Sequence, residues 1–289
     1  MNDQLQQLFD HLDLETINEN TFKTAHKNEG WRQIFGGQVL AQALLSASRT
    51  VSTERQPHSL HAYFLRPGDM SAPITFQVDR LRDGKSFTTR RVTAIQHGAA
   101  ILNLAASFQV NEDGLSHQIQ MPDVPPPEQC LTRAQLAEKF KDSLSPELLS
   151  NASRPFAIDL RLIEPENFMQ PEKREPSRAV WLRLSEPLAE DYAWHRHMLA
   201  YASDMTLLET SLRPHGISMF KSNLQIASLD HSMWFHRPFR MDEWLLYVQD
   251  SPSSSAARGF SRGNIFKRNG ELVVSVAQEG LIRLREAKT

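Results

Sequence analysis

Apolar residues recur at the spacing of an α-helix in three stretches of this chain, residues 3–12, 38–48 and 191–212. The second stretch has one continuous apolar face, formed by Val39, Leu40, Ala43, Leu44 and Ala47. These patterns predict a short helix near the start of the chain and two longer helices that lie far apart in the sequence.

Runs of residues typical of strands follow each of the two longer helices. After the first helix we expect strands at 58–65, 74–82, 86–96 and 99–110, and after the second at 224–235, 243–249, 259–267 and 272–283. Further strands are expected at 16–24, 156–163 and 179–184. One helix followed by several antiparallel strands is an α+β arrangement, and the chain has it twice.

The two units are separated by a segment of different character. Val124-Pro125-Pro126-Pro127 can extend neither a helix nor a central strand, and residues 131–149 have the spacing of one helix. We therefore expect an N-terminal unit at 1–112, a connector at 113–154 and a C-terminal unit at 155–289. An internal duplication is indicated by identities at an offset of 171 residues, where Phe64, Arg66 and Pro67 correspond to Phe235, Arg237 and Pro238.

The composition argues against several classes of protein. Lys plus Arg (32) and Asp plus Glu (34) nearly balance, whereas a dedicated nucleic-acid binder normally has a basic excess. Cys130 is the only cysteine, which excludes an intrachain disulfide and a cysteine-rich metal site. The first residues do not resemble a secretion signal, and no apolar run approaches the roughly 20 residues that span a bilayer. We expect a cytoplasmic protein with no membrane span and no nucleic-acid partner.

Two motifs suggest chemistry that the rest of the sequence does not support. Gly259-Phe260-Ser261-Arg262-Gly263 matches the G-x-S-x-G nucleophile elbow, but its flanks favour a strand, and no histidine follows Ser261. His195 and His197 point about 200° apart on a helix and cannot bind one metal ion together, so we expect surface histidines. No nucleotide-binding loop is present, and no cofactor or metal is expected.

Two polar residues interrupt apolar patterns. Asp204 lies three residues after Tyr201, on the apolar side of the helix predicted at 191–212. A carboxylate there either reaches solvent from the helix flank or is buried and takes part in chemistry. Gln278 ends the apolar run Leu272–Ala277, and a buried amide needs partners for both its N–H₂ group and its oxygen. The positions that correspond to them in the first unit are Gln38 and Ala106.

Several ordered motifs resemble the acyl-CoA thioesterase II family over nearly all of the chain: Phe35-Gly36-Gly37-Gln38, residues 58–69, Tyr201-Ala202-Ser203-Asp204, residues 229–239, residues 256–263 and Gln278-Glu279-Gly280. The resemblance implies a tandem double hotdog, with two antiparallel sheets each wrapped around a long helix, and a homodimer or homotetramer. It also implies a catalytic set of Asp204, Ser228 and Gln278. Many bacterial relatives have threonine at the middle position, and serine keeps the hydroxyl.

This resemblance implies hydrolysis of acyl-CoA by a water that Asp204 activates and that Ser228 and Gln278 orient. Covalent catalysis by Ser228 is the less favoured alternative. Candidate substrate contacts are Gly37, Gln38, His231, Arg258 and Arg262, with His231 favoured as a structural residue at a strand end. Two other functions stay open, a hydratase or dehydratase on the same fold and a non-catalytic acyl-CoA binder. A hydratase normally pairs a histidine with the carboxylate, and residues 201–212 contain none.

Overall fold

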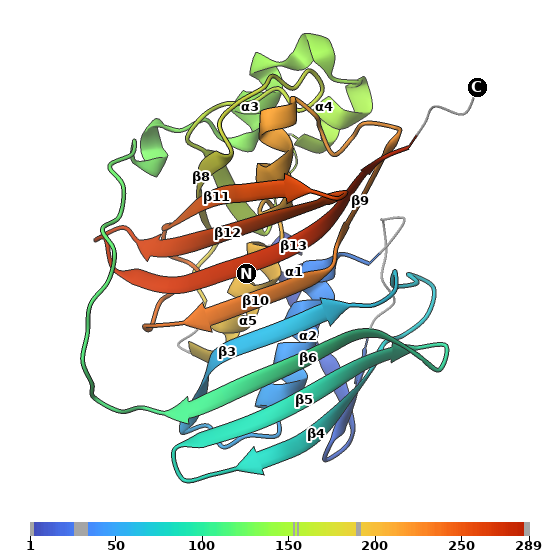
Figure 1. Cartoon of the computed structure of the whole chain (residues 1–289), viewed down its shortest axis with the longest axis vertical. Coiled ribbons are helices and arrows are strands. Elements are labelled where there is room, and N and C mark those ends of the chain that lie inside the picture. Colours follow the sequence, from blue (N-terminus) through green and yellow to red (C-terminus); the bar gives the residue numbers. More distant parts are fainter. Residues whose placement is uncertain (1–2, 26–33, 153, 155, 189–191, 286–289) are drawn as a thin grey trace.

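A computed structural model describes residues 3–25, 34–152, 154, 156–188 and 192–285. Its main feature is one antiparallel sheet (Figure 1). In spatial order its strands are β1 (Leu14–Asn18), β2 (Thr21–Thr24), β4 (Thr75–Asp83), β5 (Phe87–Gln96), β6 (Ala99–Val110), β3 (Arg55–Phe64), β10 (Asp230–Phe235), β13 (Leu272–Leu284), β12 (Arg258–Lys267), β11 (Leu245–Ser255), β8 (Ser177–Leu184) and β7 (Ile158–Leu162). A further strand, β9 (Leu224–Ser228), pairs with the end of β13.

The sequence predicted two sheets, and the structure corrects this to one. Strands β3 and β10 pair in antiparallel register from Tyr63 opposite Asp230 to Ser59 opposite Trp234. Their hydrogen bonds join the strands that follow the first long helix to those that follow the second. Both strands place alternate apolar side chains, such as Leu60 and Met233, in the core.

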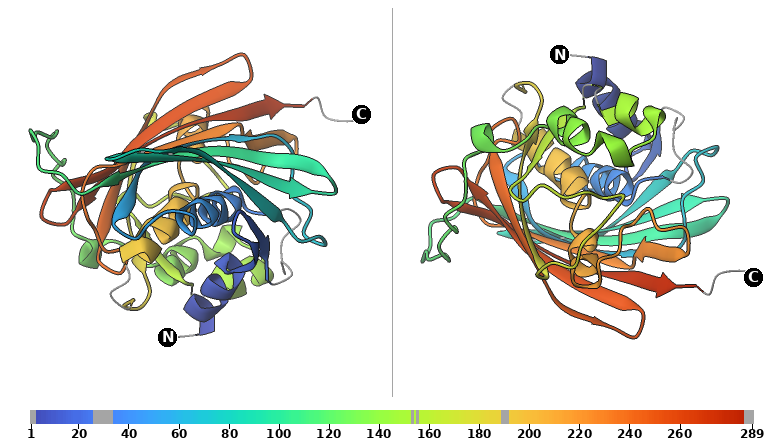
Figure 2. Two further views of the ribbon diagram at one scale, coloured as in Figure 1. Left: turned by 90° about the horizontal axis from the view of Figure 1, so that it is seen from below. Right: turned by 90° about the horizontal axis from the view of Figure 1, so that it is seen from above.

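Two helices, α2 (Gly36–Ser48) and α5 (Tyr192–Ser203), lie side by side on the concave face of the sheet (Figure 2). Their apolar side chains fill the core, where Leu40, Leu44 and Leu199 are fully buried. Burial of each such leucine stabilises the fold by about 1.5–3 kcal/mol. Helix α1 (Asp3–Leu12) packs beside α2, and its prediction from the sequence is confirmed. None of the described helices is long and apolar enough to cross a membrane.

The predicted helix at 191–212 is interrupted. Helix α5 ends at Ser203, residues 204–207 form a turn, and a 3-10 helix, η3 (Leu208–His215), follows. The hydroxyl of Ser203 bonds to the carbonyl oxygen of Ala200, and the hydroxyl of Tyr247 donates to the carbonyl oxygen of Ser203. These contacts lie in the last turn of α5, next to the point at which the chain leaves α-helical geometry.

The predicted strand at 224–235 is divided in two. The register pairs Ser228 with Gly280 and Ser232 with Ala277, so three residues of one strand face two of the other. Leu229 occupies this bulge, where its N–H donates to Glu279 and its carbonyl oxygen accepts from Phe64. A bulge of one residue changes the face to which the later side chains point.

Other differences are local. The predicted strand at 16–24 is the hairpin of β1 and β2, and the predicted helix at 131–149 is two short helices, α3 (Arg133–Lys139) and α4 (Pro146–Ala152), with 3-10 turns η1 (Pro127–Gln129) and η2 (Lys141–Ser143). Residues 111–126 contain no helix or strand and run along the surface. They contact the β12–β13 turn, where Gln118 bonds to Gly270 and Leu272.

Candidate active site

The structure brings Asp204, Ser228 and Gln278 together. Gln278 Nε2 donates to Asp204 Oδ1 at 2.8 Å and to Ser228 Oγ at 2.7 Å, and Ser228 Oγ lies 3.4 Å from the same carboxylate oxygen. Asp204 comes from the turn after α5, Ser228 from the end of β9 and Gln278 from β13. The side chain of Asp204 is 5% exposed and Gln278 is fully buried, so Ser228, which is half-buried, is the most accessible of the three.

The amino end of α2 meets Asp204. The residue before this helix is Phe35, which provides no side-chain cap, and the N–H of Gly37 donates instead to the Asp204 carboxylate. A Cβ atom on Gly36 would lie 2.7 Å from Asp204 Oδ2, and one on Gly37 would lie 2.3 Å from the carbonyl oxygen of Tyr201. The two glycines therefore allow α2 to approach the end of α5 closely.

Burial makes Asp204 more basic than an ordinary aspartate. Desolvation raises the pKa of Asp204 to about 6, against the hydrogen bonds from Gln278, Gly37 and Ser228, which lower it. At neutral pH the group is mostly a carboxylate, with a proton affinity suited to accepting a proton in a reaction. The same burial, together with the Asp204 charge, raises the pKa of the neighbouring Tyr201 to about 12.

His231 is a fourth member of this site. Its Nδ1 atom lies 3.9 Å from Asp204 Oδ1, and its Nε2 atom lies 2.9 Å from the hydroxyl oxygen of Ser203. The ring is fully buried, which lowers its pKa to about 4. His231 is the second residue of β10, which agrees with its interpretation as a structural residue at a strand end, and its contact with substrate stays a prediction. In a regular strand Ser228 and His231, three residues apart, would face opposite sides; the bulge at Leu229 turns both toward Gln278.

The other candidate substrate contacts fall into two groups. Gly37 and Gln38 lie in the first turn of α2, beside Asp204. Arg258 and Arg262 are exposed on the face of β12 opposite to the buried Ser261, where they pair with Glu279 and Asp250. The structure does not bring these two arginines to the Asp204 centre.

The G-x-S-x-G motif lies within β12, with no helix after it, so the expectation against a nucleophile elbow is confirmed. Its glycines have packing roles, since a Cβ atom on Gly259 would lie 2.4 Å from Ser211 Oγ and one on Gly263 would lie 2.3 Å from the ring of Tyr247. Ser261 is fully buried, directly opposite Gln278 in the β12–β13 register.

The prediction that His195 and His197 lie at the surface is wrong. Both side chains are buried on different sides of α5, where His195 Nδ1 accepts from the N–H of Met241 and His197 Nε2 lies 3.1 Å from Ser48 Oγ. Their separation fits the expectation that they do not chelate one ion. Among the described residues, no three histidine, cysteine or acidic side chains are grouped as metal ligands.

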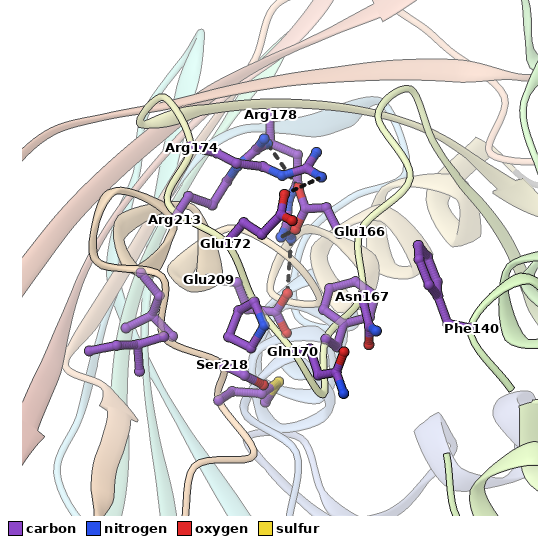
Figure 3. Close-up of a pocket in the computed structure, with 15 residues that line it drawn as sticks. Phe140, Glu166, Asn167, Gln170, Glu172, Arg174, Arg178, Glu209, Arg213 and Ser218 are labelled. Carbon is purple, nitrogen blue, oxygen red and sulfur yellow. Dashed lines mark hydrogen bonds and ion pairs between the residues drawn. The ribbon is translucent and has the colours of Figure 1, made fainter. Parts of the chain in front are cut away.

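A pocket of about 350 Å³ lies beside η3 and contains none of the three catalytic candidates (Figure 3). Its charged side chains bond to one another. Arg178 donates to Glu166 at 2.8 Å and to Glu209 at 2.9 Å, and Arg213 lies 3.1 Å from Glu166. The three arginines that line the pocket are balanced by three glutamates, so it presents no excess charge to an anionic ligand. We interpret this ionic cluster as the contact that holds residues 164–178 against η3.

Comparisons with solved structures place the chain in the class of hotdog-fold thioesterases. It matches a hot dog-fold protein from Alicyclobacillus acidocaldarius with a TM-score of 0.75 at 20% identity, which bears on the fold alone. It also matches acyl-CoA thioesterase II TesB2 from Mycobacterium marinum with a TM-score of 0.79 at 41% identity, over 96% of this chain and 99% of that one.

Sequence comparisons define the family more closely. A model described as acyl-CoA thioesterase matches residues 151–281, and one described as the acyl-CoA thioesterase N-terminal domain matches residues 27–109. The chain is 38% identical to acyl-CoA thioesterase 2 of Haemophilus influenzae, over 99% of this chain and 100% of that protein. It is 40% identical to acyl-coenzyme A thioesterase 8 of Mus musculus, over 95% and 88% of the two chains. The chain therefore belongs to the acyl-CoA thioesterase II family.

Proposed function

We propose that this chain hydrolyses acyl-CoA to a free acid and CoA with a water molecule that Asp204 activates. The observation that carries the proposal is the buried carboxylate of Asp204, whose pKa is raised to about 6, in contact with the two polar side chains of Ser228 and Gln278. Membership of the acyl-CoA thioesterase II family supports the choice of substrate.

In the proposed reaction the Asp204 carboxylate takes a proton from water while the water oxygen forms a bond to the thioester carbonyl carbon. The resulting tetrahedral intermediate then collapses, the carbon–sulfur bond breaks, and the proton held by Asp204 passes to the leaving thiolate. Ser228 accepts a hydrogen bond from Gln278, which leaves its own proton free to hydrogen-bond to Asp204 or to the attacking water. Gly37 and Gln38 are the proposed substrate contacts, because they lie beside Asp204.

A covalent route through Ser228 needs a base that removes the hydroxyl proton. Asp204 Oδ1 is the nearest base, and its distance of 3.4 Å from Ser228 Oγ is long for a hydrogen bond between oxygens. A water that hydrogen-bonds to both groups from the accessible side of Ser228 is the better nucleophile. Trapping an acyl group on Ser228 by rapid quench and mass spectrometry would overturn this assignment.

The hydratase alternative needs a separate test, because the structure brings His231 to within 3.9 Å of Asp204. The absence of histidine from residues 201–212 therefore does not exclude a carboxylate–histidine pair. Full burial and a pKa lowered to about 4 make His231 a poor proton donor to substrate, which favours hydrolysis.

We further propose that the single sheet is a tandem double hotdog, with one half around α2 and the other around α5. The two family models, which match 27–109 and 151–281, support two units joined by the proposed connector at 113–154. We also propose a role in fatty acid metabolism in the cytoplasm, in keeping with an acyl-CoA substrate. A homodimer or homotetramer is the expected assembly, and sedimentation analysis tests it.

Release of free thiol from acyl-CoA substrates of short, medium and long chain tests the proposed function. We expect wild type to release thiol and Asp204→Ala to lose the activity, while Asp79→Ala, which removes an exposed carboxylate from β4, retains it. Addition of water to an enoyl-CoA without thiol release would instead show a hydratase. Binding without either reaction would show a non-catalytic binder.

A further inference from the structure

The orientation of the Gln278 amide matters to the site. Its N–H₂ group uses both protons, one toward Asp204 Oδ1 and one toward Ser228 Oγ. If the amide rotated by 180°, its oxygen would face the Asp204 carboxylate, the hydrogen bond to Asp204 would be lost, and Ser228 could bond to Gln278 only by donating its own proton. The present orientation leaves Gln278 Oε1 buried with no hydrogen-bond partner. A donor on that side would favour this orientation over the rotated one.

His231 is placed to be this donor. Its Nδ1 atom is also buried without a hydrogen-bond partner, and the ring points to the same face of the sheet as Gln278 because of the bulge at Leu229. A contact with the Gln278 side chain raises the pKa of His231, in opposition to the larger lowering by burial. The two unpartnered buried atoms therefore belong to neighbouring side chains. A proton on His231 Nδ1 would provide the donor that Gln278 Oε1 needs.

Ser203 decides which nitrogen of His231 carries the proton. Its oxygen lies 2.9 Å from His231 Nε2, and its single proton can be donated to this nitrogen, to the carbonyl oxygen of Ala200 at 2.9 Å or to Met233 Sδ at 3.5 Å. If Nε2 carried the proton, the Nδ1 lone pair would face Asp204 Oδ1 at 3.9 Å, and in the arrangement inferred here it would also face the oxygen of Gln278, whose side chain contacts the ring. Three acceptors would then meet in a buried site. Donation from Ser203 to Nε2 places the proton on Nδ1 and removes this repulsion.

We propose that His231 is a positioning residue, whose Nδ1–H donates to Gln278 Oε1 and holds the amide with its N–H₂ group toward Asp204 and Ser228. The inference rests on the proposed function. In this arrangement Ser203, His231 and Gln278 form a chain of hydrogen bonds that ends on the Asp204 carboxylate. His231 touches no substrate and transfers no proton in the reaction.

A competing donor is Ser261, which lies opposite Gln278 in the β12–β13 register and has a buried hydroxyl without a hydrogen-bond partner. A hydroxyl donates to an amide oxygen as readily as an imidazole does. The test must therefore separate the two residues.

Three variants make this separation. In His231→Asn the δ-amide reaches the position of Nδ1, whereas in His231→Gln the ε-amide reaches the position of Nε2 and nothing replaces the Nδ1 donor. We expect kcat of His231→Gln to fall by about 100-fold with KM little changed, since a misplaced Gln278 loosens the site without removing a substrate contact. His231→Asn should recover most of kcat, and Ser261→Ala should keep the wild-type kcat.

The measurements are steady-state thiol release and the melting temperature of each variant. Equal kcat for His231→Asn and His231→Gln, whether high or low, would overturn the inference, because a merely structural role does not distinguish the two amides. Loss of kcat in Ser261→Ala alone would assign the donor to Ser261 and also overturn it. Failure of the proposed function is recognised separately, because wild type would then release no thiol.

Discussion

The N–H of Gly37 at the start of α2 donates to the carboxylate of Asp204 at the end of α5. A carboxylate at a helix N-terminus satisfies an amide that has no partner within the helix and interacts favourably with the helix dipole. The residue that caps α2 therefore comes from 167 positions further along the chain. This contact places the proposed base of the reaction at a fixed position between the two central helices.

The first prediction concerns pH. Because burial raises the pKa of Asp204 to about 6, kcat/KM should fall tenfold per pH unit below about pH 6 as the carboxylate is protonated. His231, with a pKa lowered to about 4, does not titrate in this range. Initial rates between pH 4.5 and 8.5 provide the profile. A profile that stays flat down to pH 4.5 would mean that an ordinary, solvated carboxylate controls the reaction.

The second prediction separates activity from stability. A buried group with a raised pKa favours its neutral form, so the fold is free of the ionisation penalty below about pH 4 and carries the full penalty above about pH 6. Asp204→Asn removes the penalty and should stabilise the protein at pH 8 by up to about 3 kcal/mol, but little at pH 4. Activity should be lost. Denaturant unfolding at both pH values measures the effect, and equal changes at the two values would contradict it.

Gly36 gives a third prediction. An alanine Cβ atom at this position would lie 2.7 Å from Asp204 Oδ2, so Gly36→Ala should displace the carboxylate and lower kcat/KM by about 100-fold. Alanine is the better helix former by up to about 1 kcal/mol, but the same Cβ atom would lie 3.1 Å from the ring of Phe64, so the melting temperature is measured together with the activity. Gly114→Ala is the matched control, because a Cβ atom on Gly114 has no neighbour within 4 Å. Full activity of Gly36→Ala would show that the site tolerates a shifted carboxylate.

The Ser228 hydroxyl is tested by two substitutions at one position. Ser228→Thr keeps the hydroxyl that meets Gln278 and Asp204, and its activity should stay close to that of wild type. Ser228→Ala removes it and should lower kcat by about 10²-fold or more, as expected for a group that positions a reactant. Thiol release measures both. Similar rates for the two variants would remove the hydroxyl from the mechanism.

The ionic cluster beside η3 leads to a prediction about stability. The side chain of Arg178 is 4% exposed and bonds to both Glu166 and Glu209, so Arg178→Met leaves the largely buried Glu209 without its cation and Glu166 with Arg213 alone. This change should destabilise the fold by about 3–5 kcal/mol. Arg262→Met is the control, because its pair with Asp250 is exposed and should contribute less than about 1 kcal/mol. Equilibrium unfolding in urea compares the two variants.

Much of the fold could be predicted because it depends on local periodicity. Helix α1, helix α2 and strands β4, β5 and β6 lie close to the residues expected for them. Asp204 and Gln278 could also be identified, since each places a polar group in an otherwise apolar pattern. The sequence did not predict that the two sheets are joined into one. The pairing of β3 with β10 depends on contacts between residues about 170 positions apart.

The features that could not be predicted depend on contacts between residues remote in the sequence. His231 lies at the start of β10, as expected for a strand-end residue, but residues 224–235 look like one regular strand, and the pattern carries no sign of the bulge at Leu229 that turns its ring toward Gln278. Ser203 lies in a family motif, but a serine in a helix has no special chemistry by itself, and its role depends on the contact with His231. His195 and His197 were expected at the surface, and their burial depends on Met241 and Ser48, which are remote in sequence.

The pairing of β3 with β10 also bears on the role of the peptide segment that links β6 to η1. Residues 111–120 are exposed, and Leu115 is fully accessible to solvent. Hydrogen bonds between β3 and β10 hold the two parts of the sheet together whether or not this segment is intact. A protease that cuts near Leu115 should therefore yield two fragments that remain associated and active, so the two parts of the molecule are candidates for expression as separate, complementing polypeptides.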